Sequence, residues 1–303
     1  MRIATSQYQA MMTQSLQANQ ERVTYVTQQM ANGNRIQLPS DDPVDSVRLS
    51  RLNREEAALA QYRRNIAAVQ ERLSKNEGSL QNMVTDMTSG RDLLVWASDG
   101  SNTPQDLNAM VTSLTSLRDS LLYNANSKDQ EGRYIFSGTV TGSAPIAYNA
   151  GAPLGARYGY AGNTNEQLVV VGNGVTQVGN QNVKGLEALL NQMDQTIATL
   201  SATGVNANDP AVRATVKANL DGFDAAMDLV AGKVAVIGGQ QNILKTIDAN
   251  HENVSLSNQT AILDIGQLDV GTAAIELNGY QTALQASYKA YSKIGTLSLF
   301  SAL

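Results

Sequence analysis

The feature that most constrains this chain is a heptad repeat over residues 44–98. Large apolar residues recur there at every seventh position without a break: Leu52, Leu59, Ile66, Leu73, Leu80, Met87 and Leu94. Most positions three residues further on are also apolar, as at Val69 and Met83. Seven successive heptads predict one long amphipathic helix in a coiled-coil or bundle seam. At 1.5 Å per residue, this helix would span roughly 80 Å, so the expected shape is a rod.

Three helix starts are marked by a capping side chain followed by proline. They are Asp42-Pro43, Thr103-Pro104 and Asp209-Pro210. A side-chain oxygen can accept from the free N–H groups of the first turn, and proline suits the first helical position. Asp41-Asp42 could also be read as a carboxylate pair for metal or acid–base chemistry, but its place directly before Pro43 favours the structural helix start. A further helix is expected from Leu186, with a break near residues 203–209.

Between Val140 and Val183 the helical period is lost. Eight glycines fall in this stretch, and short apolar runs resemble strands joined by turns. Asn173-Gly174 is a favoured hairpin dipeptide. The same run suggests a dinucleotide-binding loop, but the position for its third glycine holds Gln177 and no clear helix follows. A small β-rich insert is therefore predicted over residues 140–184.

Both chain ends repeat the heptad pattern. In the C-terminal segment the seventh positions are Leu256, Leu263, Val270, Leu277, Leu284 and Tyr291, and their companions are Ala273, Tyr280 and Ile294. The first 34 residues show a weaker stripe. Gly266 and Gly271 interrupt the C-terminal seam, and each glycine costs roughly 1 kcal/mol against alanine in a helix. We therefore expect a bend or break there.

Charge separates the ends from the middle. Residues 44–98 carry 15 charged side chains in 55 positions, whereas residues 1–34 carry three and residues 251–303 carry six in 53. A helix facing water normally carries charge on its outer face. The two ends are therefore expected to pack against protein on several sides.

Composition excludes several classes of function. The net charge of −5 argues against nucleic acid, because affinity for phosphates comes from Lys and Arg. The chain has no cysteine, no apolar run long enough to span a membrane, and no N-terminal segment typical of a cleavable secretory signal. Composition alone predicts a cytoplasmic protein.

Few residues indicate a chemical site. His251 is the one histidine of the chain and lies in a polar helical stretch, which predicts a solvated helix residue. Arginines from Arg48 to Arg64 alternate with glutamates, which favours a salt-bridged exposed face over a phosphate site. Nothing assembles a nucleophile, a base and an orienting group. We expect no enzyme, no catalytic residue, no metal site and no cofactor.

Four segments together resemble a known family. ANGNRIQLPSDDPV (residues 31–44) and the opening MRIATSQ resemble the N-terminal signature of the flagellar hook-associated protein 3 family, the hook–filament junction proteins. GRYIFSGT (residues 132–139) resembles the entry to that family's outer domain. The stretch from Leu268 through LQASYKAYSKIGTLSLFSAL resembles the tail shared by flagellins and hook-associated proteins. At residues 237–240 the family more often has an arginine-led turn, where this chain reads Ile-Gly-Gly-Gln.

The resemblance implies a mainly α fold divided along the chain. Residues 1–43 would form the N-terminal axial helix and turn, 44–139 the long helices of a rod domain, 140–184 a small β-rich outer domain, 185–265 the returning rod helices, and 266–303 the C-terminal axial helix. The axial helices would pair as a coiled coil lining the inner tube of the flagellum.

The implied function is that of a structural subunit joining hook to filament. Its partners would be further copies of itself, hook-associated protein 1, flagellin and a flagellar export chaperone, with no nucleic acid and no membrane insertion. Export through the flagellar type III apparatus would place it outside the cell, which replaces the cytoplasmic expectation. Flagellin itself is the near alternative, and a cytoplasmic coiled-coil scaffold is a more distant one.

The assembly interface is expected on the terminal stripes. Its predicted residues are Met12, Leu16, Val23, Val26, Met30, Leu277, Tyr280, Leu284, Tyr291, Ile294, Leu297, Leu299, Phe300 and Leu303.

Overall fold

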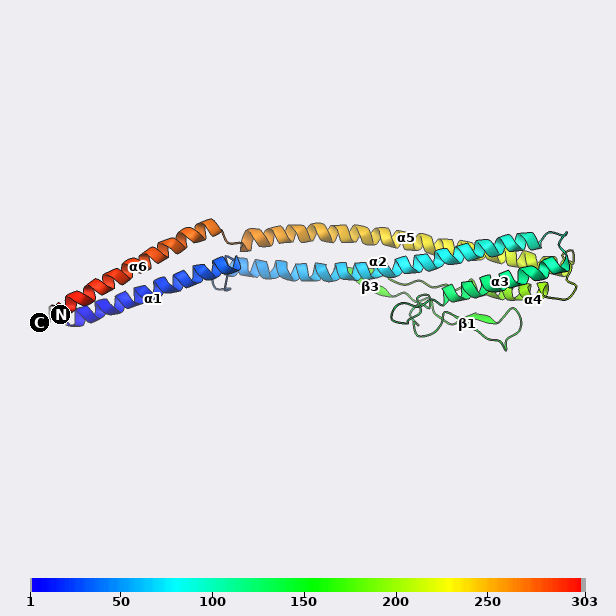
Figure 1. The fold of residues 1–303 in the computed structure, drawn as a ribbon, viewed down its shortest axis with the longest axis horizontal. Coiled ribbons are helices and arrows are strands. Elements are labelled where there is room, and N and C mark those ends of the chain that lie inside the picture. Colours follow the sequence, from blue (N-terminus) through cyan, green and yellow to red (C-terminus); the bar gives the residue numbers. More distant parts are fainter. Residues whose placement is uncertain (1, 301–303) are drawn as a thin grey trace. The chain divides into compact units, whose positions relative to one another are not determined.

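The computed structural model describes the backbone of residues 2–300 and the side chains of residues 7–293. Its elements are the helices α1 (Arg2–Asn32), α2 (Pro43–Ala97), α3 (Pro104–Ala125), α4 (Leu186–Leu200), α5 (Pro210–Gly266) and α6 (Val270–Phe300), with the strands β1 (Ile146–Tyr148), β2 (Tyr158–Tyr160), β3 (Leu168–Gly172) and β4 (Val175–Val178) (Figure 1). The predicted mainly α class with a small β-rich part is confirmed. Over residues 2–300, each helix is too short or too polar to cross a membrane.

The chain divides into two compact units. One is Leu59–His251, here called the body, and the other joins the two chain ends, up to Ala58 and from Glu252, here called the terminal unit. The body holds parts of α2 and α5, all of α3 and α4, and the four strands. The terminal unit holds α1, α6 and the adjoining ends of α2 and α5.

The predicted heptad of α2 forms the core of the body. Its residues from Ile66 to Leu94 are at most 1% exposed, and so is Met83 at a companion position. The heptad of α3 is buried in the same way at Leu107, Leu114 and Leu121. Because these positions recur with the helical period, each helix turns one continuous apolar stripe inward. The prediction of a buried seam over this part of α2 is confirmed.

Helix α5 contributes a second heptad that was not predicted. Its buried positions are Val216, Phe223, Val230, Ile237 and Leu244. At Gly90 the two helices approach closely, because a Cβ atom placed there would lie 2.6 Å from Cζ of Phe223. The helix also continues without a break through residues 237–240, so the turn typical of the family is absent at those positions.

Polar pairs show that α2 and α5 run antiparallel in the body. Arg63 lies 2.9 Å from Asp248, and Arg91 lies 2.7 Å from Asp224. As the residue number rises along α2, it falls along α5. These pairs flank the seam and fix its register.

The strands form two separate hairpins. β1 pairs with β2, and β3 pairs with β4, both antiparallel. Gly174 has a φ of +71°, as the turn at Asn173-Gly174 requires, which confirms the predicted hairpin. The buried residues Ile146, Tyr158 and Val171 belong to the same core cluster as the helices. The hairpins therefore add to the helical core.

The predicted role of His251 is wrong. Its ring stacks on Tyr62 with centroids 5.7 Å apart, and its Nε2 lies 2.7 Å from the carbonyl oxygen of Val171. Asn65 on α2 donates to the carbonyl oxygen of Val170, at 2.8 Å. His251 therefore holds the β3–β4 hairpin on the helices. A single-helix periodicity cannot reveal this, because the hairpin is about 80 residues away in sequence.

Two of the predicted helix starts in the body are confirmed. Thr103 and Asp106 form a reciprocal capping box at the start of α3. At α5, a carboxylate oxygen of Asp209 accepts from the N–H of Ala211 at 2.8 Å.

Candidate assembly surface

Helices α1 and α6 form an antiparallel pair within the terminal unit (Figure 1). The guanidinium of Arg22 lies 5.6 Å from the ring centroid of Tyr280. Val26 and Ala273 are each 3% exposed at the seam. Two helices alone cannot cover a full apolar stripe, so most of the seam is half-buried.

Many predicted interface residues lie on this intramolecular seam. The half-buried ones are Met12, Leu16, Val23, Met30, Leu277, Tyr280 and Leu284. Tyr291 is 45% exposed. The side chains of Ile294, Leu297, Leu299 and Phe300, and all of Leu303, lie outside the described residues. The heptad residues of α1 and α6 thus pack first against each other, within one chain.

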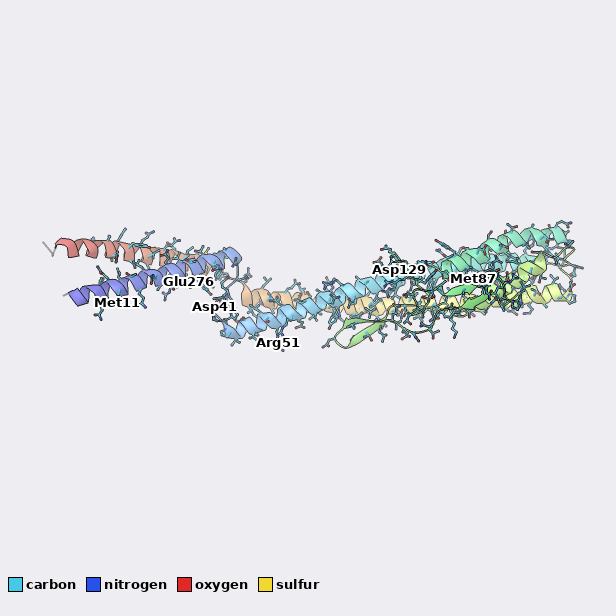
Figure 2. The ribbon with its side chains drawn as sticks, turned by 90° about the horizontal axis from the view of Figure 1, so that it is seen from below. Met11, Asp41, Arg51, Met87, Asp129 and Glu276 are labelled. Atoms are coloured by element: carbon cyan, nitrogen blue, oxygen red, sulfur yellow. The ribbon has the colours of Figure 1, made fainter. Side chains whose placement is uncertain are left out.

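The outward faces of α1 and α6 carry exposed apolar residues, most of them outside the predicted stripes. Ile275 is 76% exposed, Met11 68%, Val270 57%, Tyr288 49% and Tyr8 46%. Figure 2 labels Met11 on α1. Val270 was predicted to lie on the heptad stripe of the seam, and that prediction is wrong, because its side chain faces outward. The other four residues lie off that stripe, so a search for one periodicity does not find them. Their signal was the low charge of both ends, which leaves several faces of each helix free for protein contact.

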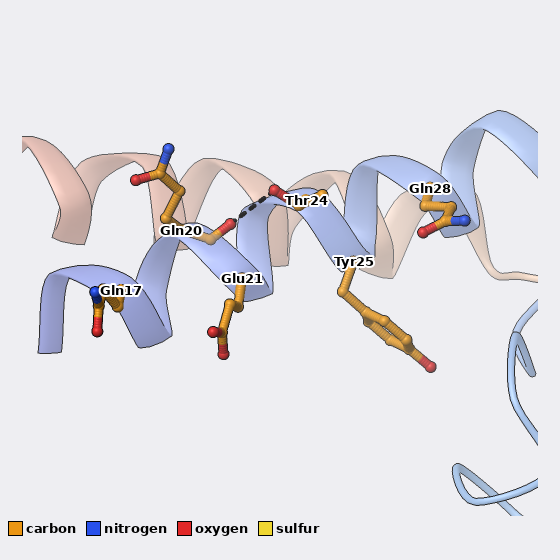
Figure 3. A pocket seen from close by; sticks show the side chains of 6 residues that line it. All are labelled: Gln17, Gln20, Glu21, Thr24, Tyr25 and Gln28. Atoms are coloured by element: carbon orange, nitrogen blue, oxygen red, sulfur yellow. Dashed lines mark hydrogen bonds between the residues drawn. The ribbon is translucent and has the colours of Figure 1, made fainter. Parts of the chain in front are cut away.

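A different face of α1 is polar and hollowed. A hollow of about 560 Å³ is lined by Gln17, Gln20, Glu21, Thr24, Tyr25 and Gln28 (Figure 3). The Thr24 hydroxyl donates to the carbonyl oxygen of Gln20, at 2.9 Å. The glutamine amides can both donate and accept hydrogen bonds, so this face suits polar contacts with a neighbouring chain.

The turn after α1 is organised by Asp41. Gly33, with a φ of +70°, ends the helix. Oδ2 of Asp41 accepts from the N–H of Leu38 at 2.8 Å, the N–H of Gln37 at 3.0 Å and the hydroxyl of Tyr25 at 2.7 Å. The Leu38 N–H and then the Tyr25 hydroxyl lower the pKa of Asp41, while burial and then the carboxylate raise the pKa of Tyr25. Asp41 therefore holds the turn.

Asp42 lies at the start of α2. Its Oδ1 accepts from the N–H of Asp45 at 3.1 Å, and Pro43 is the first helical residue. That N–H, followed by the Arg35 guanidinium, lowers the pKa of Asp42. Asp45 adds negative charge in the first turn, where the helix dipole favours it.

Arg35 links this helix start to the end of α5. Its guanidinium lies 3.1 Å from Oδ2 of Asp42 and 2.8 Å from Oδ2 of Asp45. The same group donates to the carbonyl oxygen of Ile265, at 3.1 and 3.2 Å, and the Arg35 N–H donates to that of Gly266, at 2.8 Å. A cation at a helix C-terminus and carboxylates at a helix N-terminus are both favoured by the dipoles.

The role of Arg35 was not predicted from the sequence. The residues it contacts on α5 are 230 positions away, so no local pattern reveals them. Its signal was a single arginine in a charge-poor stretch just before Asp41-Asp42.

The predicted break at Gly266 is confirmed, since α5 ends there and α6 begins at Val270. The N–H of Leu268 donates to the carbonyl oxygen of Gly33, at 3.0 Å. The segment after α1 and the segment between α5 and α6 therefore pair as a short antiparallel bridge. Asp269 caps α6, and its pKa is lowered first by the N–H of Thr272. Gly271 lies inside the first turn of α6 and causes no break.

The terminal part of α5 turns a different face inward than predicted. Leu256 is 65% exposed and Leu263 56%, whereas Asn258 is 8% exposed. Oε2 of Glu56 on α2 accepts from the hydroxyl of Ser255, at 2.6 Å. The prediction that Leu256 and Leu263 lie in the seam is wrong, because α5 keeps the inward face set by its Val216–Leu244 heptad. Residues 251, 258 and 265 continue that register.

Comparisons with known proteins agree with this arrangement. The model of the bacterial flagellin N-terminal helical region matches residues 3–141. Flagellar hook-associated protein 3 of Escherichia coli is 29% identical over 287 residues, which is 90% of each chain. A solved structure of a flagellar hook-associated protein from Vibrio parahaemolyticus is 35% identical, with a TM-score of 0.68, and covers 75% of this chain and all of its own. The chain belongs to the flagellar hook-associated protein 3 family.

Another solved structure shows the same fold at lower identity. The flagellar junction protein of Legionella pneumophila is 14% identical, with a TM-score of 0.59, over 72% of this chain and all of its own. Membership of the family makes this chain a structural protein of the bacterial flagellum, where it assembles with hook and filament components.

Proposed function

We propose that this protein is the adaptor subunit that joins the hook, through hook-associated protein 1, to the flagellin filament. The observation that carries the proposal is the match to hook-associated protein 3 along 90% of both chains. The Legionella protein of the same fold is described as a junction protein, which supports this role.

The proposed mechanism is assembly by packing of the terminal unit. Its exposed apolar side chains, such as Met11, Ile275 and Leu256, are costly in water. Burying them against neighbouring subunits gains about 25 cal/mol per Å² of apolar area. An adaptor needs a face for the preceding junction protein and a different face for flagellin. Head-to-tail contacts of this kind generate rings when the rotation closes and helical tubes when it does not.

We further propose that the chain reaches this place through the flagellar type III apparatus with a dedicated chaperone. A chaperone would cover the apolar faces of α1 and α6 before assembly. This accounts for helices that carry large apolar residues on more than one side.

Flagellin remains the second candidate, because residues 3–141 match a region that flagellins have. The two roles differ in where flagellin goes when the protein is missing. A junction protein retains flagellin on the hook, whereas flagellin forms the filament itself.

Deletion of the gene in a motile host tests the proposal. We expect hooks without filaments in electron micrographs and flagellin monomers in the culture medium. Filaments of normal length would contradict any essential junction role. Loss of filaments with no flagellin in the medium would favour the flagellin alternative. Restoration by the wild-type gene on a plasmid is the control.

A further inference from the structure

We propose that neighbouring copies of this chain contact one another side by side through two complementary faces of the terminal unit. The basic face is on α2, at residues 44–54, and the acidic face follows the end of α5 and the start of α6, at residues 256–270. This inference rests on the proposed function, because it names one of the partners in the assembly.

The basic face is a single exposed stripe of α2. Val44 is 71% exposed and Val47 62%. Arg48, Arg51 and Arg54 are exposed beside them, at spacings of three and four residues that place all five on one side of a helix. Figure 2 labels Arg51 on this part of α2.

The arginines of this face form few ion pairs and hydrogen bonds within the described part of the chain. Arg48 lies 3.4 Å from Asp45, and Arg54 donates to the carbonyl oxygen of Ser50, at 3.2 Å. Arg51 forms no ion pair with any residue that the structure describes. Its guanidinium is therefore available to a carboxylate of another chain.

The acidic face has the opposite charge and the same apolar character. Leu256, Leu263 and Val270 are 65%, 56% and 57% exposed. Asp264 and Asp269 are exposed nearby, and Asp269 also caps the start of α6. From residue 246 to residue 288 the sequence has no Lys or Arg. This face therefore presents leucine and valine side chains among carboxylates.

The basic face of one copy complements the acidic face of another, whereas two copies of the same face do not complement each other. Arginine opposite aspartate is attractive, whereas two basic faces or two acidic faces would repel. The apolar residues on each face can bury one another between the charges. The contact is therefore heterologous, with the basic face of one copy on the acidic face of the next. Because the contact pairs two unlike faces, it can propagate around a ring or along a helix.

Cysteine cross-linking tests the pairing directly, because the natural chain has no cysteine. Val47→Cys and Leu263→Cys variants are expressed as full chains, alone and together, in the deletion strain, and detached flagella are oxidised. We expect a disulfide-linked dimer of this chain only when both variants are present. A dimer formed by either variant alone would show a symmetric contact and overturn the inference. So would absence of any dimer, or a cross-link to a different flagellar protein.

Charge reversal gives an independent test that needs no cysteine. Arg51→Glu and Asp264→Arg alone should each lower the number of filaments per cell about tenfold, because like charges then face each other. The double variant should restore the number to within about twofold of wild type, because the pair is rebuilt with its charges exchanged. Lys245→Glu, an equivalent reversal at an exposed position of α5 in the body, is the control and should have no effect.

Failure to restore filaments in the double variant would overturn the side-by-side contact. The proposed function is tested separately by the gene deletion. If the deletion strain sheds flagellin but cross-linking and rescue both fail, the junction role stands and only the lateral contact is rejected. If the deletion strain makes normal filaments, both fail.

Discussion

Helices α2 and α5 meet in both units, but they bury different kinds of residue in each. In the body, the inward positions are large and apolar, such as Leu80, Met87 and Phe223, all at 0% exposure. In the terminal unit, the inward positions include Asn258 and the Glu56–Ser255 pair, while Leu256 and Leu263 face outward. The same two helices thus bury their large apolar side chains between them in the body and expose large apolar side chains in the terminal unit.

The difference indicates that the two parts of each helix have different roles. Apolar residues turned inward stabilise the isolated chain, and apolar residues turned outward gain nothing until another chain covers them. The same residue types therefore serve folding in the body and, in the proposed assembly, contacts between subunits in the terminal unit.

The largest expected effect separates a buried aromatic from an exposed leucine. Phe223→Ala removes a fully buried ring and should lower the free energy of unfolding by about 3–5 kcal/mol. Leu263→Ala, at an exposed position, should change it by less than about 0.5 kcal/mol. Urea denaturation followed by circular dichroism measures both. Similar losses for the two variants would remove the distinction between the regions.

A buried amide in the body gives the next effect. Asn76 is 0% exposed, and its side chain finds no hydrogen-bond partner among the described residues. Asn76→Leu should raise the free energy of unfolding by about 1–3 kcal/mol, because burying an unpaired amide is costly. The same denaturation experiment measures it. A destabilised Asn76→Leu protein would contradict this prediction.

Arg35 should have a smaller and more local effect. Arg35→Ala removes the link between Asp42, Asp45 and the end of α5, which should cost about 1 kcal/mol because the guanidinium is partly exposed. Amide hydrogens of residues 33–42 should exchange faster, with those around Phe223 unchanged. Arg35→Lys keeps the charge but not the planar fork, and should recover only part of the protection. Equal loss of protection in both segments would show that the turn and the body unfold together.

The smallest effect is the pH response of the turn. Asp41 and Asp42 have folded pKa values below their ordinary value of 3.8. Their contribution to stability is therefore fully present above about pH 4 and is lost as the pH falls through the folded pKa values. Carboxyl carbon NMR titration, with Asp41→Asn for assignment, should give midpoints below 3.8. Midpoints at or above that value would contradict the hydrogen bonds described for the turn.

Much of the fold could be predicted where one stripe of a helix is clearly apolar. The heptad of α2 has no competing stripe between Leu52 and Leu94, so its inward face follows from the sequence. The end of α5 offers two stripes, and the more apolar one, through Leu256 and Leu263, is the one that faces outward. The register set by Val216–Leu244 decides the orientation, and a local pattern does not include it.

The turn and the proposed interface were harder to predict for another reason. Arg35 and His251 act through backbone carbonyl groups distant in sequence, at Ile265 and Val171. Every residue has a backbone carbonyl group, so the sequence does not show which one a side chain contacts. The exposed Met11 and Ile275 belong to no strong period, and their signal was the low charge of the ends.

Truncation tests the central claim, that the body folds without the ends and the ends serve assembly. A chain lacking residues 1–34 and 270–303 should unfold in urea in one cooperative transition, with a free energy within about 1 kcal/mol of the full chain, and should not assemble. Loss of the cooperative transition would contradict the account.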